Sequence, residues 1–538
     1  MYSIGLDFGS TAVRALIINL ETGIEVSSAS NDYACGTRGV CLDPDDPQLA
    51  RQEPAAYIAA MKNSIIQAVA LAVKNDSAFS PEKVGGIGVD ATSATLIPVT
   101  CDMTPLAALD EFRGNLNALS WMWKDHTALA EADEITRLAK ELHPEYLDRC
   151  GGSYSSEWFW SKTLHALRID REVFDAAYAW IELCDFIPAL LGGTKDYSLV
   201  RCSAGAAGHK AMYAEEWGGL PDEEFLKRLA PELADLRNRL YQKTYAGNEV
   251  AGYLSKEWAD ILGLAAGTPL AAGMIDAHSG AVGSGAAPGK MVCIIGTSTC
   301  DITAAAFPDG VPQIKGISGI AKHSVLPGFY GIEGGHAAVG DSFYWQAATI
   351  SGCTDFAELE KQAAEVVPTK DSVIAIDWLN GNRNPYANEK LKGIMLGMTL
   401  HTTPAEMYRA WLEATAFGVR QVLDILSEAG FEISEIICGG GIPEKSPLLM
   451  QIYADILGRP MRLPASRETC ALGAALCGAA AGKLISSVEE GQKKLCKFKD
   501  KSYSPDLSRK EVYDLLYSKY CLVGKEFATG SLAGIMNS

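Results

Sequence analysis

Asp7 is an aspartate in a segment where a buried strand would carry apolar residues. It stands between Gly5 and Gly9 in the stretch IGLDFGSTAVRALIINL (4–20), and a short Gly-Ser-Thr turn follows it. Such a turn presents consecutive backbone N–H groups and hydroxyls, which can hold phosphate oxygens. A carboxylate just before the turn can hold a hydrated Mg²⁺ on the same phosphates. These residues indicate a phosphate site, and the alternative is an ordinary hairpin with a polar tip.

A second stretch repeats this pattern far along the chain. Residues 291–305, MVCIIGTSTCDITAA, again read as strand, Gly-Thr-Ser-Thr turn and strand. Residues 437–447, ICGGGIPEKSP, predict a strand that passes through three glycines into a helix over 448–457. Two hairpins and one glycine-rich junction together favour nucleotide binding. Paired hairpins at the start of two halves also suggest an internal duplication of the fold.

Two better-known phosphate motifs are not supported. The segment GAAPGK (285–290) lacks the GxxxxGK[ST] spacing of a P-loop, and Met291 follows its lysine. No GxGxxG follows the first strand, so a dinucleotide-binding fold is not indicated either.

Asp276 is the candidate for acid–base chemistry. In GMIDAH (273–278) it follows a short apolar run and precedes a glycine-rich segment, so we expect it at a strand end in a cleft between two domains. A carboxylate at such a place can accept the proton of a hydroxyl group that attacks a phosphoryl group. The alternative for Asp276 is helix capping. The neighbouring His278 is interpreted as structural rather than catalytic.

The elements that must position these residues follow the pattern of an α/β protein. The hairpin at 4–20 is followed by a strand candidate, an amphipathic helix that begins near Pro54, and a short apolar strand that ends in Asp90; these lie at 25–34, 54–74 and 84–92. Strands that alternate with helices indicate a mainly parallel sheet.

Length and charge restrict the function classes. A chain of 538 residues is too long for one hydrophobic core, so two large domains are expected. A net charge of −19 argues against nucleic acid or an anionic membrane as the main partner. It does not exclude an anionic substrate, because backbone N–H groups bind phosphate without net positive charge.

The 14 cysteines are scattered and form no CxxC pair, which predicts reduced thiols in a cytosolic enzyme rather than a disulfide framework or a zinc site. No secretory signal is recognised at the N-terminus. The longest apolar run, 470–482, is shorter than the roughly 20 residues of a membrane-spanning helix and predicts a buried helix. A cytoplasmic location is therefore expected.

The sequence resembles the FGGY family of carbohydrate kinases over nearly its whole length. The segments YSSEWFW, WIELCD and IGTSTCDI point to the members that act on ribulose rather than to glycerol or gluconate kinases. The resemblance is carried by GLDFGSTAVRAL (5–16), WKDHTALAEADEIT (123–136), GGSYSSEWFWSKTLH (151–165), WIELCDFIPALL (180–191), GHKAM (208–212), EWGGLP (216–221), GMIDAHSGAVG (273–283), IGTSTCDI (295–302), PGFYGIEGG (327–335), DWLNGNRNPYAN (377–388) and GGGIPEKSPLLMQ (439–451).

The resemblance implies the actin-like ATPase (ribonuclease H-like) fold, with two similar α/β domains and ATP in the cleft between them. The implied domains are 1–284, with the sugar site and the first phosphate hairpin, and 285–486, with the second hairpin and the adenosine motif. Residues 487–538 are expected to form a helical C-terminal tail.

The resemblance also implies roles for single residues. Asp7 positions Mg²⁺ through water, and Asp276 is the catalytic base. The nucleotide-binding residues it implies are Asp7, Gly9, Ser10, Thr11, Arg14, Gly296, Thr297, Ser298, Gly340, Gly440, Gly441 and Ser446. The sugar-binding residues it implies are Trp123, Lys210, Asp276 and Glu333. Core packing is the alternative for Trp123, and a solvated surface lysine is the alternative for Lys210.

Three segments depart from the family pattern. CSAGAAGHK, which ends at Lys210, is longer by a few residues than the usual form. Ser446 stands where most family members have asparagine, which is expected to weaken contacts with the base and ribose. His336, in GGH after Glu333, is expected to change the shape of the sugar pocket.

The function implied is ATP-dependent, Mg²⁺-dependent phosphorylation of a ketopentose, most closely L-ribulose to L-ribulose 5-phosphate in arabinose catabolism. A preference for another pentulose or polyol, such as D-ribulose or D-xylulose, is the first alternative. An actin-like polymer and a catalytically silent sugar sensor are alternatives of a different class. The expected partners are a sugar and ATP, without nucleic acid or membrane, and a homodimer is left open.

Overall fold

The computed structural model describes residues 1–308, 310–312, 314–353 and 355–536, and packing divides the chain into two compact units. Unit 1 comprises Met1–Gly285, Ile320–Gly331 and Glu468–Cys496, and unit 2 comprises Ala286–Gly319, Ile332–Arg467 and Lys497–Ser538.

This division agrees with the expected boundary near residue 285 and differs from the expected ranges elsewhere. Residues 468–496 pack with unit 1, although sequence proximity assigned most of them to the second domain. The expected helical tail is also not one element, because α17 (Val488–Leu495) belongs to unit 1, whereas β23 (Phe498–Tyr503) joins the sheet of unit 2.

The main sheet of unit 1 is built around the predicted N-terminal hairpin. β1 pairs antiparallel with β2 and parallel with β6, and β14 also pairs with β6. The strands, in their order across the sheet, are β12 (Val250–Tyr253), β13 (Pro269–Ala271), β6 (Val84–Ala91), β1 (Tyr2–Phe8), β2 (Ala12–Asn19) and β3 (Glu25–Asp32), with β14 (Met274–Ile275) beside β6.

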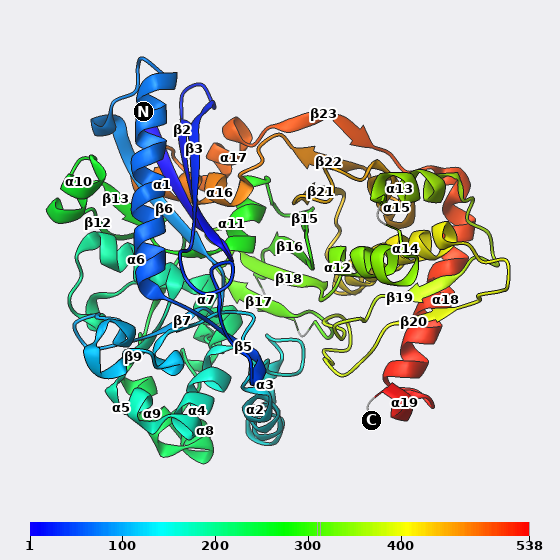
Figure 1. Ribbon diagram of the computed structural model, residues 1–538, viewed down its shortest axis with the longest axis horizontal. Helices are drawn as coiled ribbons and strands as arrows, with labels where there is room; N and C mark the ends of the chain where they lie inside the picture. Colours follow the sequence, from blue (N-terminus) through cyan, green and yellow to red (C-terminus); the bar gives the residue numbers. More distant parts are fainter. Residues whose placement is uncertain (309, 313, 354, 537–538) are drawn as a thin grey trace. The chain divides into compact units, whose positions relative to one another are not determined.

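Helices cover this sheet, and α1 packs against β2 and β3 (Figure 1). α1 (Pro54–Asn75) is the one described helix that is long and apolar enough to cross a membrane. Half of its most apolar window is buried in the protein, as in the core helix of a globular unit. The other helices of unit 1 are α2 (Leu129–Leu142), α3 (Pro144–Leu147), α4 (Phe159–Ile169), α5 (Arg171–Ala176), α6 (Leu183–Gly192), α7 (Ala204–Lys210), α8 (Glu223–Leu229), α9 (Pro231–Arg239), α10 (Lys256–Leu262), α11 (Asp276–Gly283), α16 (Thr469–Ala481) and α17.

A five-stranded sheet in unit 1 carries several of the candidate sugar-site segments. Its neighbouring strands pair antiparallel. In order they are β4 (Cys41–Asp43), β5 (Asp46–Gln52), β8 (Ser120–Trp121), β7 (Leu96–Val99) and β9 (Ala179–Glu182), and a separate short pair consists of β10 (Cys202–Ser203) and β11 (Thr244–Tyr245).

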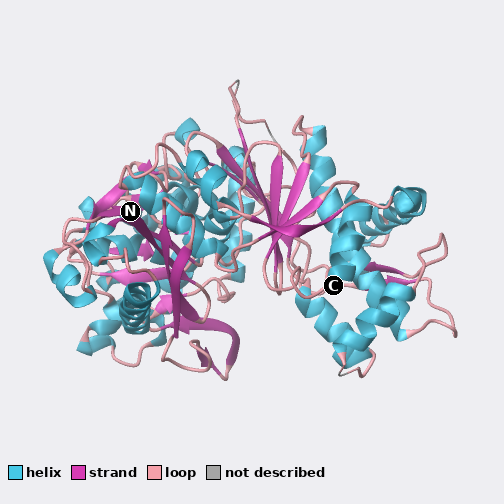
Figure 2. Cartoon of the chain, turned by 90° about the horizontal axis from the view of Figure 1, so that it is seen from above, coloured by secondary structure: helices cyan, strands magenta, loops and turns pink. Residues whose placement is uncertain are grey.

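The sheet of unit 2 repeats the arrangement of unit 1. β15 pairs antiparallel with β16 and parallel with β21, as β1 does with β2 and β6. The shared order supports the predicted duplication, and the strands fan out with a strong twist (Figure 2). The order is β18 (Tyr330–His336), β16 (Thr299–Ala305), β15 (Lys290–Ile295), β21 (Glu435–Gly439), β22 (Met461–Pro464) and β23; the remaining strands are β17 (Gly319–Lys322), β19 (Ile374–Ile376) and β20 (Ile394–Leu396).

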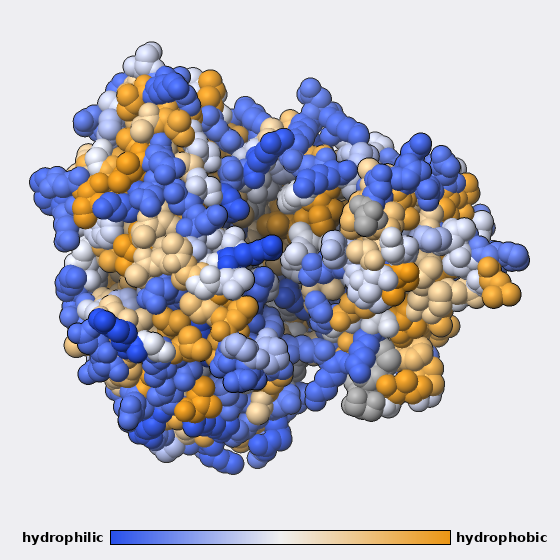
Figure 3. Space-filling view, in the orientation of Figure 1, coloured by the Kyte–Doolittle hydropathy of each residue, from blue (hydrophilic) through white to orange (hydrophobic). Residues whose placement is uncertain are grey.

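A helical group accompanies this sheet, with α14 packed against α13, α15 and α18. The helices of unit 2 are α12 (Gly340–Tyr344), α13 (Phe356–Glu365), α14 (Pro404–Glu428), α15 (Pro447–Leu457), α18 (Lys510–Ala528) and α19 (Ala533–Met536). On the face shown in Figure 3, hydrophilic residues are interspersed with hydrophobic ones.

Glycines allow α16 to lie directly on the sheet of unit 1. A Cβ on Gly5 would lie 1.7 Å from the carbonyl oxygen of Ala471, and one on Gly88 would lie 1.8 Å from that of Ala474. These separations are far below van der Waals contact, so only glycine fits at either position while α16 stays in place. The predicted buried helix over 470–482 is therefore confirmed, and its N-terminal end reaches the strands that carry the candidate carboxylates.

Gly88→Ala is expected to lower the free energy of unfolding by about 1–3 kcal/mol, because the added methyl group forces α16 away from β6. The midpoint of urea unfolding measures this change. Gly252→Ala is the matched control, since Gly252 lies in the same sheet and its nearest Cβ neighbour would be 4.0 Å away. Equal midpoints for the two variants would contradict the close packing of α16.

Candidate functional site

Hydrogen bonds to its backbone carbonyls hold the tip of the first phosphate hairpin in place. Gly9 N–H donates to the carbonyl of Ala12 at 3.0 Å, which closes the turn. Tyr33 donates through its hydroxyl to the Gly9 carbonyl at 2.9 Å and through its backbone N–H to the Thr11 carbonyl at 2.9 Å. Gln52 Nε2 donates to the Ser10 carbonyl at 2.9 Å. All three tip carbonyls are thus bonded to the protein, which fixes the predicted phosphate-binding tip.

Asp7 and Arg14 face each other across this hairpin. They are cross-strand partners, and Arg14 Nη1 donates to Asp7 Oδ2 at 2.9 Å. Arg14 also lies 3.7 Å from Glu468 at the start of α16. The Asp7 side chain is 7% exposed and that of Arg14 is 39% exposed. Arg14 is therefore placed to hold the Asp7 carboxylate while its own guanidinium stays accessible.

Three carboxylates lie near the C-terminal ends of neighbouring strands in unit 1. Asp7 on β1 is in register with Asp90 on β6, and Asp90 is in register with Met274 on β14. Asp276 directly follows β14 as the first residue of α11. Burial, together with the charges of Asp7 and Asp276, raises the pKa of Asp90 well above its usual range. The cluster thus concentrates negative charge in a buried place.

Asp276 begins α11, as a strand-end aspartate was expected to do. Its Oδ1 accepts a hydrogen bond from the N–H of Ala277 at 2.7 Å, and the residue is partly exposed. This bond joins neighbouring residues, and Ile275 rather than Asp276 is at the N-cap position, with no side-chain cap hydrogen bond. The helix-capping alternative for Asp276 is therefore not supported.

The N-terminal end of α16 meets the same cluster. Cys470 lies in its first turn, and burial and the charges of Asp7, Asp90 and Asp276 all raise the pKa of its thiol. Ser279 of α11 donates to the Cys470 carbonyl at 2.8 Å, which joins the two helices. The positive ends of two helix dipoles thus lie beside the cluster, where they stabilise negative charge.

The candidate cluster fits a divalent cation. Carboxylate oxygens are the ligands that Mg²⁺ prefers in proteins, usually together with water and substrate phosphates. Asp7 and Asp90 are partners on neighbouring strands, so two residues with carboxyl groups lie side by side here. Asp7 is the member next to the phosphate hairpin, so it is the residue that would hold the metal beside phosphate.

Besides Asp276, two further predicted sugar-site residues, Trp123 and Lys210, lie in unit 1. Trp123 is partly exposed, and its indole N–H donates to Ser10 Oγ at 3.0 Å, which ties it to the phosphate hairpin rather than to the core. Lys210 is 8% exposed, so it is not a solvated surface lysine. Its Nζ lies 5.4 Å from the centre of the Trp158 ring.

The unusual CSAGAAGHK segment folds as α7. Ser203 caps this helix by accepting a hydrogen bond from the N–H of Ala206 at 3.4 Å, and Lys210 is its last residue. The additional residues are accommodated in a regular helix. They leave Lys210 buried, so the departure does not displace it to the surface.

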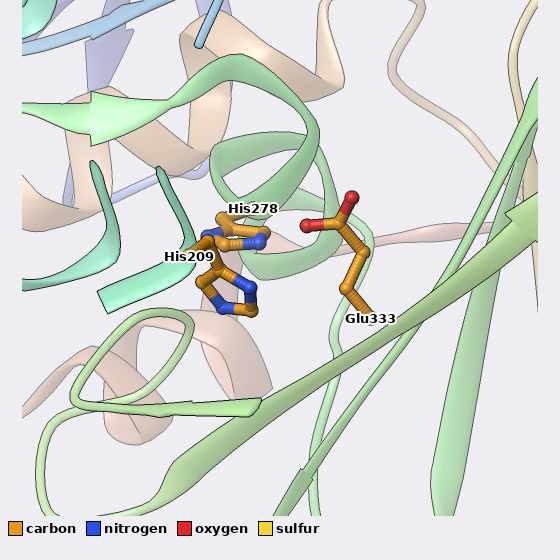
Figure 4. A group of neighbouring side chains, drawn as sticks. All are labelled: His209, His278 and Glu333. Carbon is orange, nitrogen blue, oxygen red and sulfur yellow. The ribbon is translucent and has the colours of Figure 1, made fainter. Parts of the chain in front are cut away.

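His278 packs against a second histidine, His209, as Figure 4 shows. The two ring centres are 4.7 Å apart and the rings are tilted by 60°. His209 Nε2 lies 3.1 Å from Ser324 Oγ, and Ser324 itself donates to the Ala321 carbonyl at 2.9 Å. These contacts and the full burial of His278 favour the expected structural role.

The second hairpin and Gly340 come together in unit 2. Gly296 N–H donates to the Ser298 carbonyl at 2.9 Å, and Val339 N–H donates to the Thr297 carbonyl at 2.7 Å. Gly340 N–H donates to the Gly296 carbonyl at 3.0 Å, and a Cβ on Gly340 would lie 2.7 Å from that oxygen. The structure thus joins two nucleotide candidates that are separate in sequence.

The glycine-rich junction contains Gly440 and Gly441, and the space around a Cβ atom differs between the two positions. Gly440 has φ +98° and its Cβ would lie 2.3 Å from the Ile295 carbonyl oxygen, so the protein itself requires glycine there. Gly441 is exposed, and no described atom lies within 4 Å of its would-be Cβ. Gly441 is the one whose missing side chain leaves room for a ligand.

Ser446 caps the helix that follows this junction. Its Oγ accepts from the Leu449 N–H at 3.1 Å and donates to Glu360 Oε1 at 2.9 Å. These two bonds already engage the hydroxyl. The prediction that Ser446 also meets the nucleotide stays a prediction.

Glu333 and His336 both lie on β18, and their side chains have different surroundings. Glu333 is partly exposed, and Figure 4 shows its carboxylate extending from the strand. His336 is 4% exposed and lies 3.6 Å from Asp301 and 3.7 Å from Asp377. Burial lowers the pKa of His336 to about 4 and raises that of Asp301 to about 7. The His336 ring thus lies in the interior of unit 2, and the expectation that it changes the shape of the sugar pocket stays a prediction.

Three buried residues that sequence reasoning assigned no role are also close to the candidate residues. Asp90 carried the same signal as Asp7, an aspartate that ends an apolar strand. Lys162 and Glu182, in contrast, stand in segments whose pattern allows an exposed polar side chain, and only the structure shows that both are buried.

Comparison with known proteins gives a consistent result over the whole chain. Residues 2–283 match the N-terminal domain, and residues 291–482 the C-terminal domain, of the FGGY family of carbohydrate kinases. A ribulokinase of Vibrio parahaemolyticus is 39% identical over 97% of this chain and 95% of its own length. A ribulokinase of Shouchella clausii is 36% identical over 98% of this chain and 96% of its own length.

Solved structures show the same fold. The xylulose kinase of Rhodospirillum rubrum superposes with a TM-score of 0.79 at 24% identity, covering 98% of this chain and 99% of that one. The gluconate kinase of Lactobacillus acidophilus gives a TM-score of 0.80 at 20% identity, covering 99% of each chain. The expected actin-like fold with two α/β domains is thereby confirmed.

Proposed function

Because this chain belongs to the FGGY family of carbohydrate kinases, we propose that it transfers the γ-phosphoryl group of ATP to O5 of L-ribulose. Two ribulokinases at 36–39% identity over nearly full length support a pentulose as the substrate. The observation that supports the chemistry is that Asp7 and Asp90 are in register on β1 and β6, next to β14, which Asp276 directly follows.

In this proposal Asp276 accepts the proton of the attacking hydroxyl as the new oxygen–phosphorus bond forms. The bond between the γ-phosphorus and the bridging oxygen of ATP breaks, and ADP leaves with that oxygen. A general base of this kind raises the rate by about 10²- to 10⁴-fold. Asp7 would hold Mg²⁺, which would supply positive charge to neutralise the phosphates when it is bound. Arg14 orients Asp7 through their 2.9 Å bond.

The remaining candidates bind rather than react. We propose that Gly9, Ser10 and Thr11 of the first hairpin and Gly296, Thr297 and Ser298 of the second hold phosphate. Gly340, Gly440, Gly441 and Ser446 line the nucleotide. Trp123 offers an aromatic face and a fixed orientation to the sugar, and Lys210 and Glu333 bind its hydroxyls.

The experiment is a steady-state comparison of sugars at fixed MgATP, with ADP release as the readout. L-ribulose is expected to give the highest kcat/KM, with D-ribulose, ribitol and L-arabitol lower by up to about 100-fold. A site that hydrogen-bonds hydroxyls loses about 1–3 kcal/mol for each buried group left unpaired, and about 1.4 kcal/mol corresponds to a factor of ten. Glycerol and gluconate are expected to be much poorer.

The same experiment separates the other functions. ADP release without any sugar would indicate an actin-like ATPase, and no release with any sugar would indicate a silent sensor. D-xylulose or glycerol in first place would contradict L-ribulose as the substrate while leaving the kinase fold intact.

A further inference from the structure

Lys162 is a buried lysine to which the proposed chemistry gives no role. It lies on α4 and is 0% exposed. Its ammonium group donates to the carbonyl oxygens of Ala94 at 2.6 Å, Met122 at 2.8 Å and Trp121 at 3.5 Å. A lysine has three N–H donors, so these acceptors engage all of them.

The three carbonyls belong to two separate segments that Lys162 joins. Ala94 lies between β6 and β7 with φ +52°, a left-handed conformation that is unfavourable for alanine and must be held in place. Met122 directly precedes Trp123, whose indole N–H bonds to Ser10 at 3.0 Å. Lys162 therefore fixes the backbone at the predicted sugar contact and, through it, next to the phosphate hairpin.

We propose that Lys162 is a positioning residue of the sugar site, because it fixes the backbone that carries Trp123. This inference rests on the proposed function, since it takes Trp123 as a sugar contact. Misplacing a binding group by about 1 Å can reduce the rate by about 10²-fold. Lys162 does not need to touch the sugar itself.

Lys162→Met tests this role, because methionine is similar in length and has no donor. KM for L-ribulose is expected to rise at least about 10-fold, while the dissociation constant of MgATP, measured by calorimetry without sugar, changes less than about three-fold. A variant that is merely less stable has a smaller active fraction, which lowers kcat but leaves KM unchanged. Lys162→Gln keeps N–H donors and replaces the methionine variant if that variant does not fold. Its KM for L-ribulose is expected to lie between that of the parent and that of Lys162→Met.

Thr163→Val is the matched control for this experiment. Thr163 is the next residue of α4 and is fully buried, and its hydroxyl donates to the Phe159 carbonyl at 3.0 Å, within the same helix. Its KM for L-ribulose is expected to stay within about two-fold of the parent. An equal rise in KM for Thr163→Val and Lys162→Met would overturn the role of Lys162.

The parent protein, assayed in the same series, separates this inference from the proposed function. If the parent prefers another ketose, the proposed substrate is wrong, and the variants are compared on that ketose instead. If the parent prefers L-ribulose and the KM of Lys162→Met stays within about two-fold of the parent, the proposed function stands and the positioning role of Lys162 is rejected.

Discussion

Asp276→Asn is expected to lower kcat by at least about 100-fold while the protein still binds MgATP. Asparagine keeps the size of the side chain, and its amide oxygen can still accept the Ala277 N–H that Asp276 now accepts at 2.7 Å. It cannot take the proton of the sugar hydroxyl, and general-base assistance contributes about 10²- to 10⁴-fold. Steady-state kinetics gives kcat, and calorimetric titration gives the nucleotide affinity.

Asp260→Asn is the control for this substitution. Asp260 lies on α10, and its exposed side chain pairs with Lys256 on the same helix. This control is expected to have the kcat of the parent. If Asp276→Asn also stays within a few-fold of the parent, Asp276 is not the base, and its role at the start of α11 is structural.

Asp7→Ala is expected to reduce kcat/KM for MgATP by about 10- to 100-fold, the usual effect of losing a group that orients a bound metal through other ligands. L-ribulose affinity is expected to change little, because the proposed sugar contacts do not include Asp7. The substitution also removes the partner that Arg14 bonds at 2.9 Å, so part of the loss comes from a misplaced guanidinium.

Separate titrations of sugar and nucleotide, each measured calorimetrically, test this assignment. Arg14→Lys is a useful companion, since it keeps the charge and loses the guanidinium that orients Asp7, and a smaller loss in MgATP use is expected. Weakened sugar binding with unchanged MgATP binding in Asp7→Ala would reverse the assignment of the two sites.

Individual helices and strands could be predicted because the patterns that indicate them involve residues close together in sequence. The hairpin that carries Asp7, the helix that begins at Pro54 and the strand that ends near Asp90 all follow from alternation, helical spacing and turn residues. The resemblance implied only that Gly340 lines the nucleotide, and the 3.0 Å bond from Gly340 to Gly296 shows that it lies beside the second hairpin.

The rest depends on contacts between residues far apart in sequence. Lys162 has the pattern of an exposed helix residue, and only the convergence of two loops and a helix buries it against three carbonyls. Nor does composition show that α16 packs on β1 and β6, a contact made possible by Gly5 and Gly88. The surroundings of His336 were not apparent for the same reason, because Asp301 and Asp377 are far from it in the chain order.

The ratio of kcat/KM for L-ribulose to that for D-xylulose, measured on one preparation at fixed MgATP, tests the central claim most directly. The proposed function predicts a ratio well above one, with one phosphate monoester at C5 of the sugar for each ADP released. A ratio below one, or ADP formed without sugar phosphate, would contradict it.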